Sequence, residues 1–378
     1  MSYVFTHADV YTGEEKILNG FIRFDKQIQE IGPMIDFCPR STDKNIVDLN
    51  RNFVVPGFID IHSHGGYGID TMDAKPDKIN KMVKNISIKE GVTSFFPTTV
   101  TQSNENIKKA ILAVKTASKT NPIIQGIHLE GPFISSLYKG AQPKKFIQKP
   151  NKELLNEWRK LSGNIIRLIT YAPEEGSSLD FEDYCLSHDI VPAAGHSNAT
   201  RQTMKHSKIN HVTHLFNAQR NMQHRQPGLT GHALLEENIY CELIADGFHV
   251  SPDMIKLAYE LKGAKRIELV TDSMRAKGMP EGISELGGQK VIVKDKQARI
   301  ENGNLAGSVL KYNEAFKNIM RFTGCEINEA VLMSSVNQAR EFGLKNKGSL
   351  QKGKDADFNV LDKKMMLKGT YSMGKKIN

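Results

Sequence analysis

Val-Val-Pro-Gly-Phe-Ile-Asp-Ile-His-Ser-His-Gly, residues 54–65, is a short apolar run, rich in β-branched side chains, that ends in two histidines. The pattern predicts a buried strand at Phe58–Ile61 with His62 and His64 at its C-terminal end. Side chains two residues apart on a strand point to the same side, about 6–7 Å apart along the chain, so both imidazoles can approach one metal ion. Taken alone, the stretch leaves open that they are ordinary surface histidines.

The composition is that of a globular protein with a large core. The chain has 378 residues, of which 39% are hydrophobic and 25% are charged. It contains no run of about 18 apolar residues, so we expect no membrane span. The N-terminal residues lack the pattern of a signal peptide. The four cysteines form no Cys-x-x-Cys pair and are expected to be reduced. Together these features predict a cytoplasmic protein.

The formal net charge of +9 raises the question of nucleic-acid binding. The basic residues are scattered among 42 acidic ones, and the sequence shows no basic helix and no zinc-finger spacing. This distribution favours solvated lysines on a basic protein, and we expect no nucleic-acid partner. An anionic small substrate is compatible with the charge, although the charge does not demand one.

Both ends of the chain have the pattern of short strands. Strand-like runs near the N-terminus are Val4–Val10, Glu15–Phe24 and Ile28–Ile31, with turn residues between them. Residues 352–361 also read as a turn followed by a strand. Because neither set could bury its apolar face alone, we expect residues 1–52 and 346–378 to form one small β-sandwich domain.

The central part of the chain alternates strand-like and helix-like patterns. The strand-like runs are Phe58–Ile61, Thr93–Thr98, Ile123–Leu129, Ile165–Tyr171, Ile190–Gly195, His211–Leu215, Tyr240–Ala245 and Arg266–Thr271. Helical patterns between them include Asp77–Glu90, Asn104–Ser118, Lys152–Leu161 and Pro252–Leu261. Eight such units predict a closed α/β barrel of the (β/α)8 type over residues 53–345, in preference to an open doubly wound sheet. No glycine-rich nucleotide-binding motif is present.

Polar side chains with metal-binding or acid–base chemistry follow six of these strands. They are His62 and His64, His128 and Glu130, His196, His214, Asp246 and His249, and Asp272. In a barrel the C-terminal ends of the strands meet on one face, where active sites lie. Any one of these residues could be structural, but their convergence predicts a metal site built from His62, His64, Glu130, His196, His214 and Asp272. His206 and His232 fit no such position and are expected to be structural.

These motifs resemble those of the amidohydrolase superfamily and, within it, of the N-acetylglucosamine-6-phosphate deacetylase family. The matching stretches are Pro-Gly-Phe-Ile-Asp-Ile-His-Ser-His-Gly (56–65), His-Leu-Glu-Gly-Pro-Phe (128–133), Gly-His-Ser (195–197), Thr-His-Leu-Phe-Asn-Ala (213–218), Asp-Gly-Phe-His (246–249), Thr-Asp (271–272), Leu-Ala-Gly-Ser (305–308) and Gly-Lys-Asp-Ala-Asp (353–357). The resemblance spans essentially the whole chain. Only His-Leu-Glu-Gly-Pro-Phe is specific by itself.

The resemblance implies that Glu130, His196 and His214 bind the metal common to the family. One carboxylate and two imidazoles leave a position open for water and substrate. Some members lack ligands at the positions of His62 and His64 and use one ion. Because both histidines are present here, we expect one or two divalent ions per chain, with Glu130 as the bridge between two. Nitrogen and oxygen ligands without thiolate suit zinc or iron.

The resemblance further implies that Asp272 is the general base, which takes a proton from the attacking water and gives it to the leaving amine. The residues implied in substrate binding are Ala141, Gln142, Asn217, Ala218, Arg225, His249, Leu305, Ala306 and Gly307. Arg225 is the expected phosphate partner because a guanidinium bonds phosphate through two N–H groups. In the family this arginine can reach across a subunit interface, so a homodimer is implied.

One position departs from the family pattern. Relatives commonly read Lys-Gly-Ala-His where this chain has Lys-Gly-Ala-Gln, residues 139–142. Gln142 can donate a hydrogen bond but cannot carry positive charge, which puts in doubt how the substrate carbonyl or sugar is held.

Three alternatives to an N-acetylglucosamine-6-phosphate deacetylase remain open. The first is the same chemistry on N-acetylgalactosamine 6-phosphate. The second is a cyclic-amide hydrolase, although such enzymes commonly carry a lysine after strand four, where this chain has Thr-Tyr-Ala-Pro at 170–173. The third is a non-catalytic scaffold on this fold, although such proteins usually lose the ligands that this chain retains.

Overall fold

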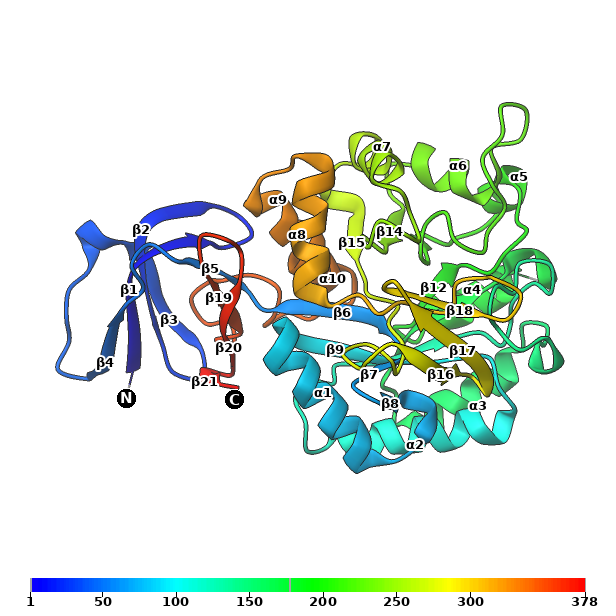
Figure 1. The fold of residues 1–378 in the computed structure, drawn as a ribbon, viewed down its shortest axis with the longest axis horizontal. Coiled ribbons are helices and arrows are strands. Elements are labelled where there is room, and N and C mark those ends of the chain that lie inside the picture. The colour runs from blue at the N-terminus through cyan, green and yellow to red at the C-terminus, as the bar shows by residue number, and fades with distance from the viewer. Residues whose placement is uncertain (1, 177, 378) are drawn as a thin grey trace.

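The computed structural model describes residues 2–176 and 178–377, which form a small sheet and a larger barrel (Figure 1). The strands of the small sheet are β1 (Ser2–Tyr11), β2 (Lys16–Phe24), β3 (Ile28–Pro33), β4 (Asp43–Asp48), β5 (Phe53–Pro56), β19 (Phe358–Leu361), β20 (Leu367–Ser372) and β21 (Lys375–Lys376). Their order is β21-β20-β19-β5-β1-β2-β3, with β4 also paired to β1. The two chain ends therefore lie in one mostly antiparallel sheet, as expected. Because β5 belongs to this sheet, we infer that the boundary between the two parts lies after Pro56 and not after residue 52.

Eight parallel strands form the barrel, which confirms the predicted fold class. They are β6 (Phe58–Ser63), β9 (Val92–Thr99), β10 (Ile127–Glu130), β11 (Ile166–Tyr171), β12 (Val191–Ala194), β13 (His211–Val212), β14 (Tyr240–Leu243) and β15 (Ile267–Leu269). Each predicted strand has its counterpart, with ends that differ by a few residues. The ring is joined beyond β15, where Ser63 and Ser273 form a parallel bridge and the Asp272 N–H donates to the His62 carbonyl oxygen at 2.8 Å.

Helices cover the outside of the barrel (Figure 1). They are α1 (Pro76–Glu90), α2 (Asn104–Ser118), α3 (Lys152–Ser162), α4 (Ser178–Leu186), α5 (Arg201–Lys205), α6 (Gly228–Leu235), α7 (Pro252–Lys262), α8 (Tyr312–Thr323), α9 (Ile327–Val331) and α10 (Asn337–Glu341). Local sequence explains their limits. Helix α1 begins with Pro76 at its first position and is terminated by the following Gly91, which adopts the left-handed conformation that favours glycine.

The apolar core is divided by the barrel wall. Inside the barrel, Ile59, Phe96 and Val270 pack with Phe342, which follows α10. Outside it, a larger cluster lies between the strands and the helices and includes the buried side chains of α1. Apolar side chains therefore fill part of the barrel interior away from the C-terminal strand ends.

An antiparallel three-stranded sheet was missed by sequence reasoning. Strands β16 (Gly282–Leu286), β17 (Gln289–Lys294) and β18 (Gln297–Ile300) lie between β15 and α8. A separate two-stranded pair, β7 (Gly65–Gly66) and β8 (Ile69–Asp70), follows β6. The three-stranded insert matters for the site because the chain leaves it through Asn304, Leu305 and Gly307, which face the barrel mouth.

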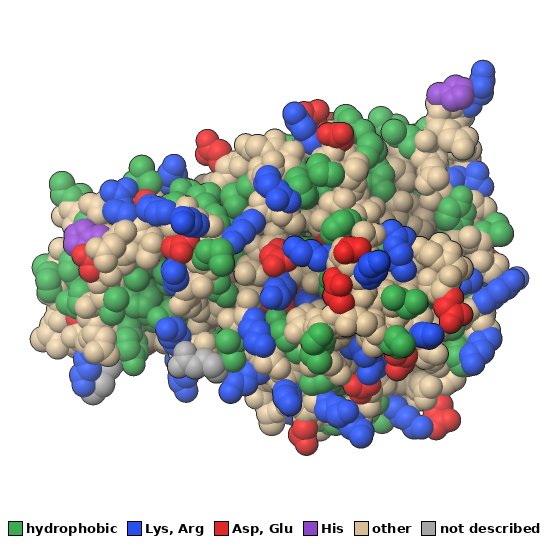
Figure 2. Space-filling model, in the orientation of Figure 1, with side chains coloured by type: hydrophobic (Ala, Val, Ile, Leu, Met, Phe, Trp, Pro, Cys, Tyr) green, Lys and Arg blue, Asp and Glu red, His purple; other side chains and the backbone are tan. Residues whose placement is uncertain are grey.

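No helix in the described part of the chain is long and apolar enough to cross a membrane. On the face shown in Figure 2, Lys and Arg side chains are spread over both parts of the molecule, with Asp and Glu among them.

Candidate metal centre and active site

The predicted metal-binding residues lie together at the C-terminal ends of the barrel strands. His62 is in β6, and Glu130 is the last residue of β10. His196, His214 and Asp272 follow β12, β13 and β15 by two or three residues, and all three adopt a left-handed backbone with φ of 48°, 32° and 45°. Such conformations are uncommon for residues other than glycine and concentrate at functional sites.

Glu130, His196 and His214 form one half of the cluster. The Nε2 atoms of both histidines lie 3.1 Å from Glu130 Oε1 and 3.1 Å from each other. Ligand atoms bound tetrahedrally to zinc at about 2.0–2.1 Å lie roughly 3.3 Å apart. The three side chains therefore have the spacing of ligands around one divalent ion.

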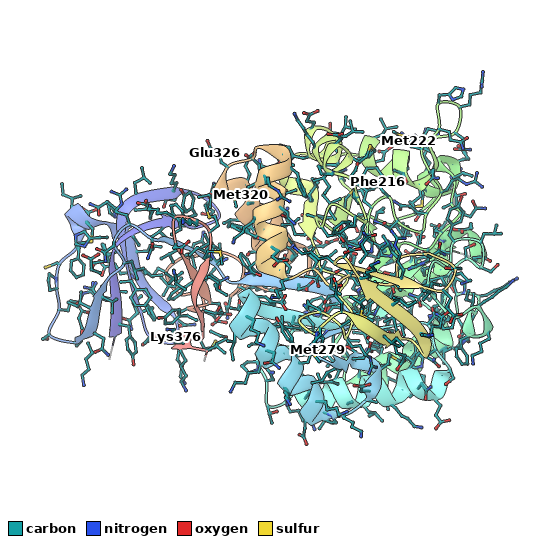
Figure 3. The ribbon with its side chains drawn as sticks, viewed as in Figure 1. Phe216, Met222, Met279, Met320, Glu326 and Lys376 are labelled. Carbon is teal, nitrogen blue, oxygen red and sulfur yellow. The ribbon has the colours of Figure 1, made fainter. Side chains whose placement is uncertain are left out.

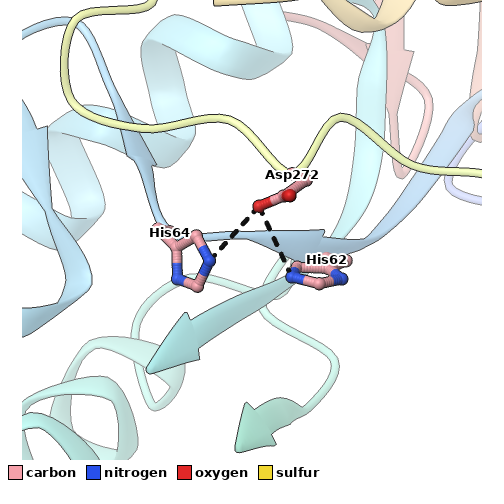
Figure 4. A group of neighbouring side chains, drawn as sticks. All are labelled: His62, His64 and Asp272. Atoms are coloured by element: carbon pink, nitrogen blue, oxygen red, sulfur yellow. Dashed lines mark ion pairs between the residues drawn. The ribbon is translucent and has the colours of Figure 1, made fainter. Parts of the chain in front are cut away.

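His62, His64 and Asp272 form the other half (Figure 4). Asp272 Oδ1 lies 3.3 Å from His64 Nε2 and 3.6 Å from His62 Nε2. Glu130 Oε2 is 3.3 Å from His64 Nε2, and Glu130 Oε1 is 3.4 Å from His62 Nε2. Glu130 therefore contacts histidines of both halves.

The carboxylates make this buried cluster attractive to positive charge. Burial opposes the charged form of His62, but Glu242 and Asp272 raise the pKa of His62 well above its usual value. Likewise, burial is outweighed at His64, where Asp272 and Glu130 raise the pKa to about 10. Burial alone would raise the pKa of Glu130, yet His196 and His214 hold it well below its usual value. A divalent cation would satisfy the same carboxylates and keep the histidines neutral as ligands.

A cavity of about 370 Å³ opens over the cluster. Seven of the nine predicted substrate-binding residues line it, namely Ala141, Gln142, Asn217, Ala218, His249, Leu305 and Gly307. Ala306 is buried beside them and does not line the cavity. Within the cavity, His249 Nδ1 lies 2.7 Å from Asp246 Oδ2, which orients the imidazole.

Comparison with known proteins agrees with this geometry. The pattern of the Amidohydrolase family matches residues 53–377. The chain belongs to the amidohydrolase family. Among its curated relatives, N-acetylglucosamine-6-phosphate deacetylase of Bacillus subtilis (strain 168) is 38% identical over 363 residues, covering 93% of this chain and 91% of the relative. The Lysinibacillus sphaericus protein of the same name is 40% identical over 329 residues, covering 85% of each.

The solved structures of this family include a close match to the whole fold. A point mutant of N-acetyl-D-glucosamine-6-phosphate deacetylase from Mycobacterium smegmatis was solved in complex with N-acetyl-D-glucosamine-6-phosphate. It superposes with a TM-score of 0.93 at 27% identity, covering 100% of this chain and 99% of that chain.

The curated relatives also include N-acetylgalactosamine-6-phosphate deacetylase of Escherichia coli O157:H7. It is 32% identical over 337 residues, covering 87% of this chain and 89% of the relative.

Gln142 forms a hydrogen bond with the candidate metal-binding cluster of this amidohydrolase. The amide nitrogen of Gln142 donates a short hydrogen bond to Glu130 Oε2. Its oxygen accepts from the Thr101 N–H at 2.8 Å, and the side chain is buried. Because its amide nitrogen and oxygen are both hydrogen-bonded, Gln142 orients the Glu130 carboxylate. Part of the Gln142 side chain also lines the cavity.

Arg225 lies outside the cavity of its own chain. It is exposed on the loop between β13 and α6, which projects from the barrel in Figure 1 and carries Met222, labelled in Figure 3. The described contact of its guanidinium is with the neighbouring His224, at 2.7 Å. The sequence grouped Arg225 with the substrate-binding residues, and the single chain does not bring it to them.

Sequence reasoning missed several residues at the site. Val100, Leu137, Tyr138 and Asn304 line the cavity, and Glu242 contacts His62 from beneath. The four lining residues sit on loops, where no periodic pattern marks them. Glu242 had a signal, because a charged residue inside the otherwise apolar strand β14 needs a buried partner.

Proposed function

We propose that this chain is a metal-dependent deacetylase that hydrolyses the acetamide of N-acetylglucosamine 6-phosphate to glucosamine 6-phosphate and acetate. The observation that carries the proposal is the convergence of Glu130, His196 and His214 with Asp272 beneath one cavity. Relatives of the same name at 38% and 40% identity support the choice of substrate. The reaction belongs to amino-sugar catabolism and cell-wall recycling, and we place the protein in the cytoplasm.

The residues present suit one or two divalent ions, for which zinc or iron is the best match to nitrogen and oxygen ligands. Glu130, His196 and His214 would hold the first ion. His62 and His64 would hold the second, with Glu130 between the two. When bound, such an ion supplies a Lewis acid that lowers the pKa of water toward neutrality and polarises the acetamide carbonyl.

Asp272 would move the proton. Its carboxylate is buried at the floor of the cavity beside the imidazoles of His62 and His64. As general base it takes a proton from the attacking water while the new carbon–oxygen bond forms. As general acid it then returns that proton to the nitrogen when the carbon–nitrogen bond breaks. Acetate and the free amine are the balanced products.

The sugar would be held by cavity residues, and its phosphate by a second subunit. Asn217, His249 and the backbone near Gly307 surround the space above the cluster. Arg225 stands on a projecting loop away from this space, so it would serve the cavity of a partner in a homodimer. A charged guanidinium on an exposed tip is well placed to pair with phosphate across an interface.

The deciding experiment is acetate release from N-acetylglucosamine 6-phosphate, with the N-acetylgalactosamine isomer and the unphosphorylated sugar assayed alongside. We expect the first substrate to have the highest kcat/KM. A preference for the galactosamine isomer would favour the activity named for the Escherichia coli relative. No acetate release from any of them by the metal-loaded protein would favour a non-catalytic scaffold.

Metal removal tests whether the proposed deacetylation depends on a metal ion. Chelation should abolish acetate release, because the water then keeps its ordinary pKa and the carbonyl is not polarised. Adding back a divalent ion should restore the rate. Full activity in a preparation shown by elemental analysis to be metal-free would contradict the proposed chemistry.

A further inference from the structure

Beneath the metal cluster lies a buried carboxylate that touches both of its halves. Glu242, in β14, is fully buried, and its Oε2 atom lies 2.8 Å from His62 Nδ1. The same oxygen accepts a hydrogen bond from the backbone N–H of His214 at 3.1 Å. One oxygen therefore contacts the imidazole of a ligand in one half and the main chain of a ligand in the other.

The contact with Glu242 dictates which nitrogen of His62 is free. When His62 is neutral, as a metal ligand must be, the carboxylate beside Nδ1 accepts the hydrogen of that atom, so the lone pair lies on Nε2. His62 Nε2 is buried, has no hydrogen-bond partner among the described residues, and lies near Glu130 and Asp272. The Nε2 atom of His62 therefore points toward the cluster as a potential ligand, and the contact of Nδ1 with Glu242 fixes the orientation of the ring.

Glu242 is itself held in place from the far side. Its other oxygen, Oε1, lies 3.2 Å from His211 Nε2, and His211 Nδ1 lies 3.0 Å from Glu341 Oε2. The backbone carbonyl of Glu242 accepts from the Leu215 N–H at 2.8 Å. A line of buried polar groups therefore runs from His62 through the barrel to Glu341 at the end of α10.

We infer that Glu242 is a positioning residue that fixes His62 as a ligand of the second ion and steadies the chain at His214. The inference rests on the two-ion centre proposed above. Metal-binding histidines generally donate their second ring N–H to such an outer acceptor, and removal of the acceptor commonly weakens metal binding about 10–100-fold.

The test compares metal affinity, measured by competition with a chelator, in the full-length protein loaded with zinc. Glu242→Gln keeps the shape and one acceptor but removes the charge, and Glu242→Ala removes the acceptor. We expect the second equivalent of zinc to bind about 10-fold more weakly in Glu242→Gln and about 100-fold more weakly in Glu242→Ala. The first equivalent should change less, because the side chains of Glu130, His196 and His214 remain.

The matched control is Glu268→Gln. Glu268 is the register partner of Glu242 on β15 and is equally buried, but it makes no described contact with His62 or His214. We expect wild-type zinc affinity from this variant. Equal weakening in Glu268→Gln and Glu242→Gln would overturn the inference, because substitution of any buried carboxyl group in this layer would then suffice.

His62→Ala separates the two proposals. If His62→Ala loses the second equivalent while Glu242→Gln keeps it at wild-type affinity, the inference about Glu242 is wrong and the two-ion centre stands. If His62→Ala keeps the second equivalent at wild-type affinity, His62 is not a ligand of that ion and the inference falls. Should Glu242→Ala fail to fold, the zinc affinity of Glu242→Gln decides, and less than about a 3-fold change overturns the inference.

Discussion

At the residue scale, a left-handed backbone conformation orients the side chains of three candidate site residues. His196, His214 and Asp272 each leave a strand through the left-handed region, which turns the side chain toward the barrel mouth. Such a conformation costs on the order of 1–3 kcal/mol and persists only where the surrounding structure holds it. For Asp272, that support comes from two hydrogen bonds, from its own N–H to the His62 carbonyl oxygen and from the Ser308 N–H to its carbonyl oxygen.

Asp272→Asn should leave a metal-loaded but nearly inactive protein. The amide keeps the shape of the carboxylate and cannot accept the proton, so water activation and amine departure are both impaired. We expect kcat to fall toward the upper part of the range of about 10²–10⁴-fold that is typical for loss of a general acid–base group. Measuring kcat and metal content on one sample checks this, and near-normal turnover would exclude the proton role.

Much of the site could be predicted because its residues occupy strand ends within recognisable motifs. Glu130 and Asp272 follow apolar runs, and His62 and His64 are two residues apart at the end of a strand. The remainder depends on tertiary packing that no local pattern encodes. Glu242 meets His62 across 180 residues of sequence, and Leu137 and Asn304 reach the cavity from separate loops. Arg225 is the opposite case. The family resemblance implied that it binds substrate, but within its own chain it does not reach the cavity.

At the element scale, the barrel strands were predictable because burial on both faces gives short, unbroken apolar runs. The insert β16–β18 was not predictable in the same way. In β17 buried Val291 and Val293 alternate with exposed Lys290 and Ile292, which describes a sheet with one covered face. A prediction based on alternating strands and helices does not include an antiparallel sheet inserted between a barrel strand and the next helix.

Helix α6 carries a histidine that should make stability depend on pH. Burial lowers the pKa of His232 to about 4, and its Nδ1 lies 3.4 Å from Arg201 Nη1. Between about pH 4 and the unfolded value near 6.5, the unfolded chain therefore binds more protons at this position. The free energy of unfolding contributed by His232 is fully present above the unfolded pKa and is lost as pH falls toward 4.

Urea unfolding at pH 7 and at pH 4.5 tests this dependence. His232→Gln should lose less stability than the wild type between the two pH values, because it removes the group that gains a proton on unfolding. His206→Gln is the control, since His206 is exposed on the neighbouring segment and should leave the difference unchanged. An equal loss in wild type and His232→Gln would show that other groups carry the acid sensitivity.

At the scale of the whole molecule, the position of Arg225 predicts that two subunits share each active site. Arg225→Ala should weaken binding of the phosphorylated sugar by roughly 2–4 kcal/mol and leave the unphosphorylated sugar little affected. Equal losses on the two sugars would indicate that Arg225 is structural.

Mixing two impaired variants at a low concentration of the phosphorylated sugar tests the sharing directly. In a heterodimer of Arg225→Ala and Asp272→Asn subunits, one of the two sites has both residues intact. Random pairing should restore about a quarter of the wild-type activity on the phosphorylated sugar, as two-fold symmetry requires. A mixture of Asp272→Asn and Glu130→Gln should restore none, because each defect stays in its own subunit. No recovery in the first mixture would place Arg225 at the cavity of its own chain or at neither.

The pairing of β5 with β19 has a consequence for how the protein is made. The ribosome releases the N-terminal strands first, and their partner leaves it only after about 300 further residues, some 15–60 s later at typical elongation rates. During that interval the edge of β5 that later pairs with β19 has no partner, and the residues that form the barrel are still being synthesised. A nascent chain stalled before residue 358 would therefore expose Val54 and Val55, which the finished protein buries completely, and would be a natural target for chaperones.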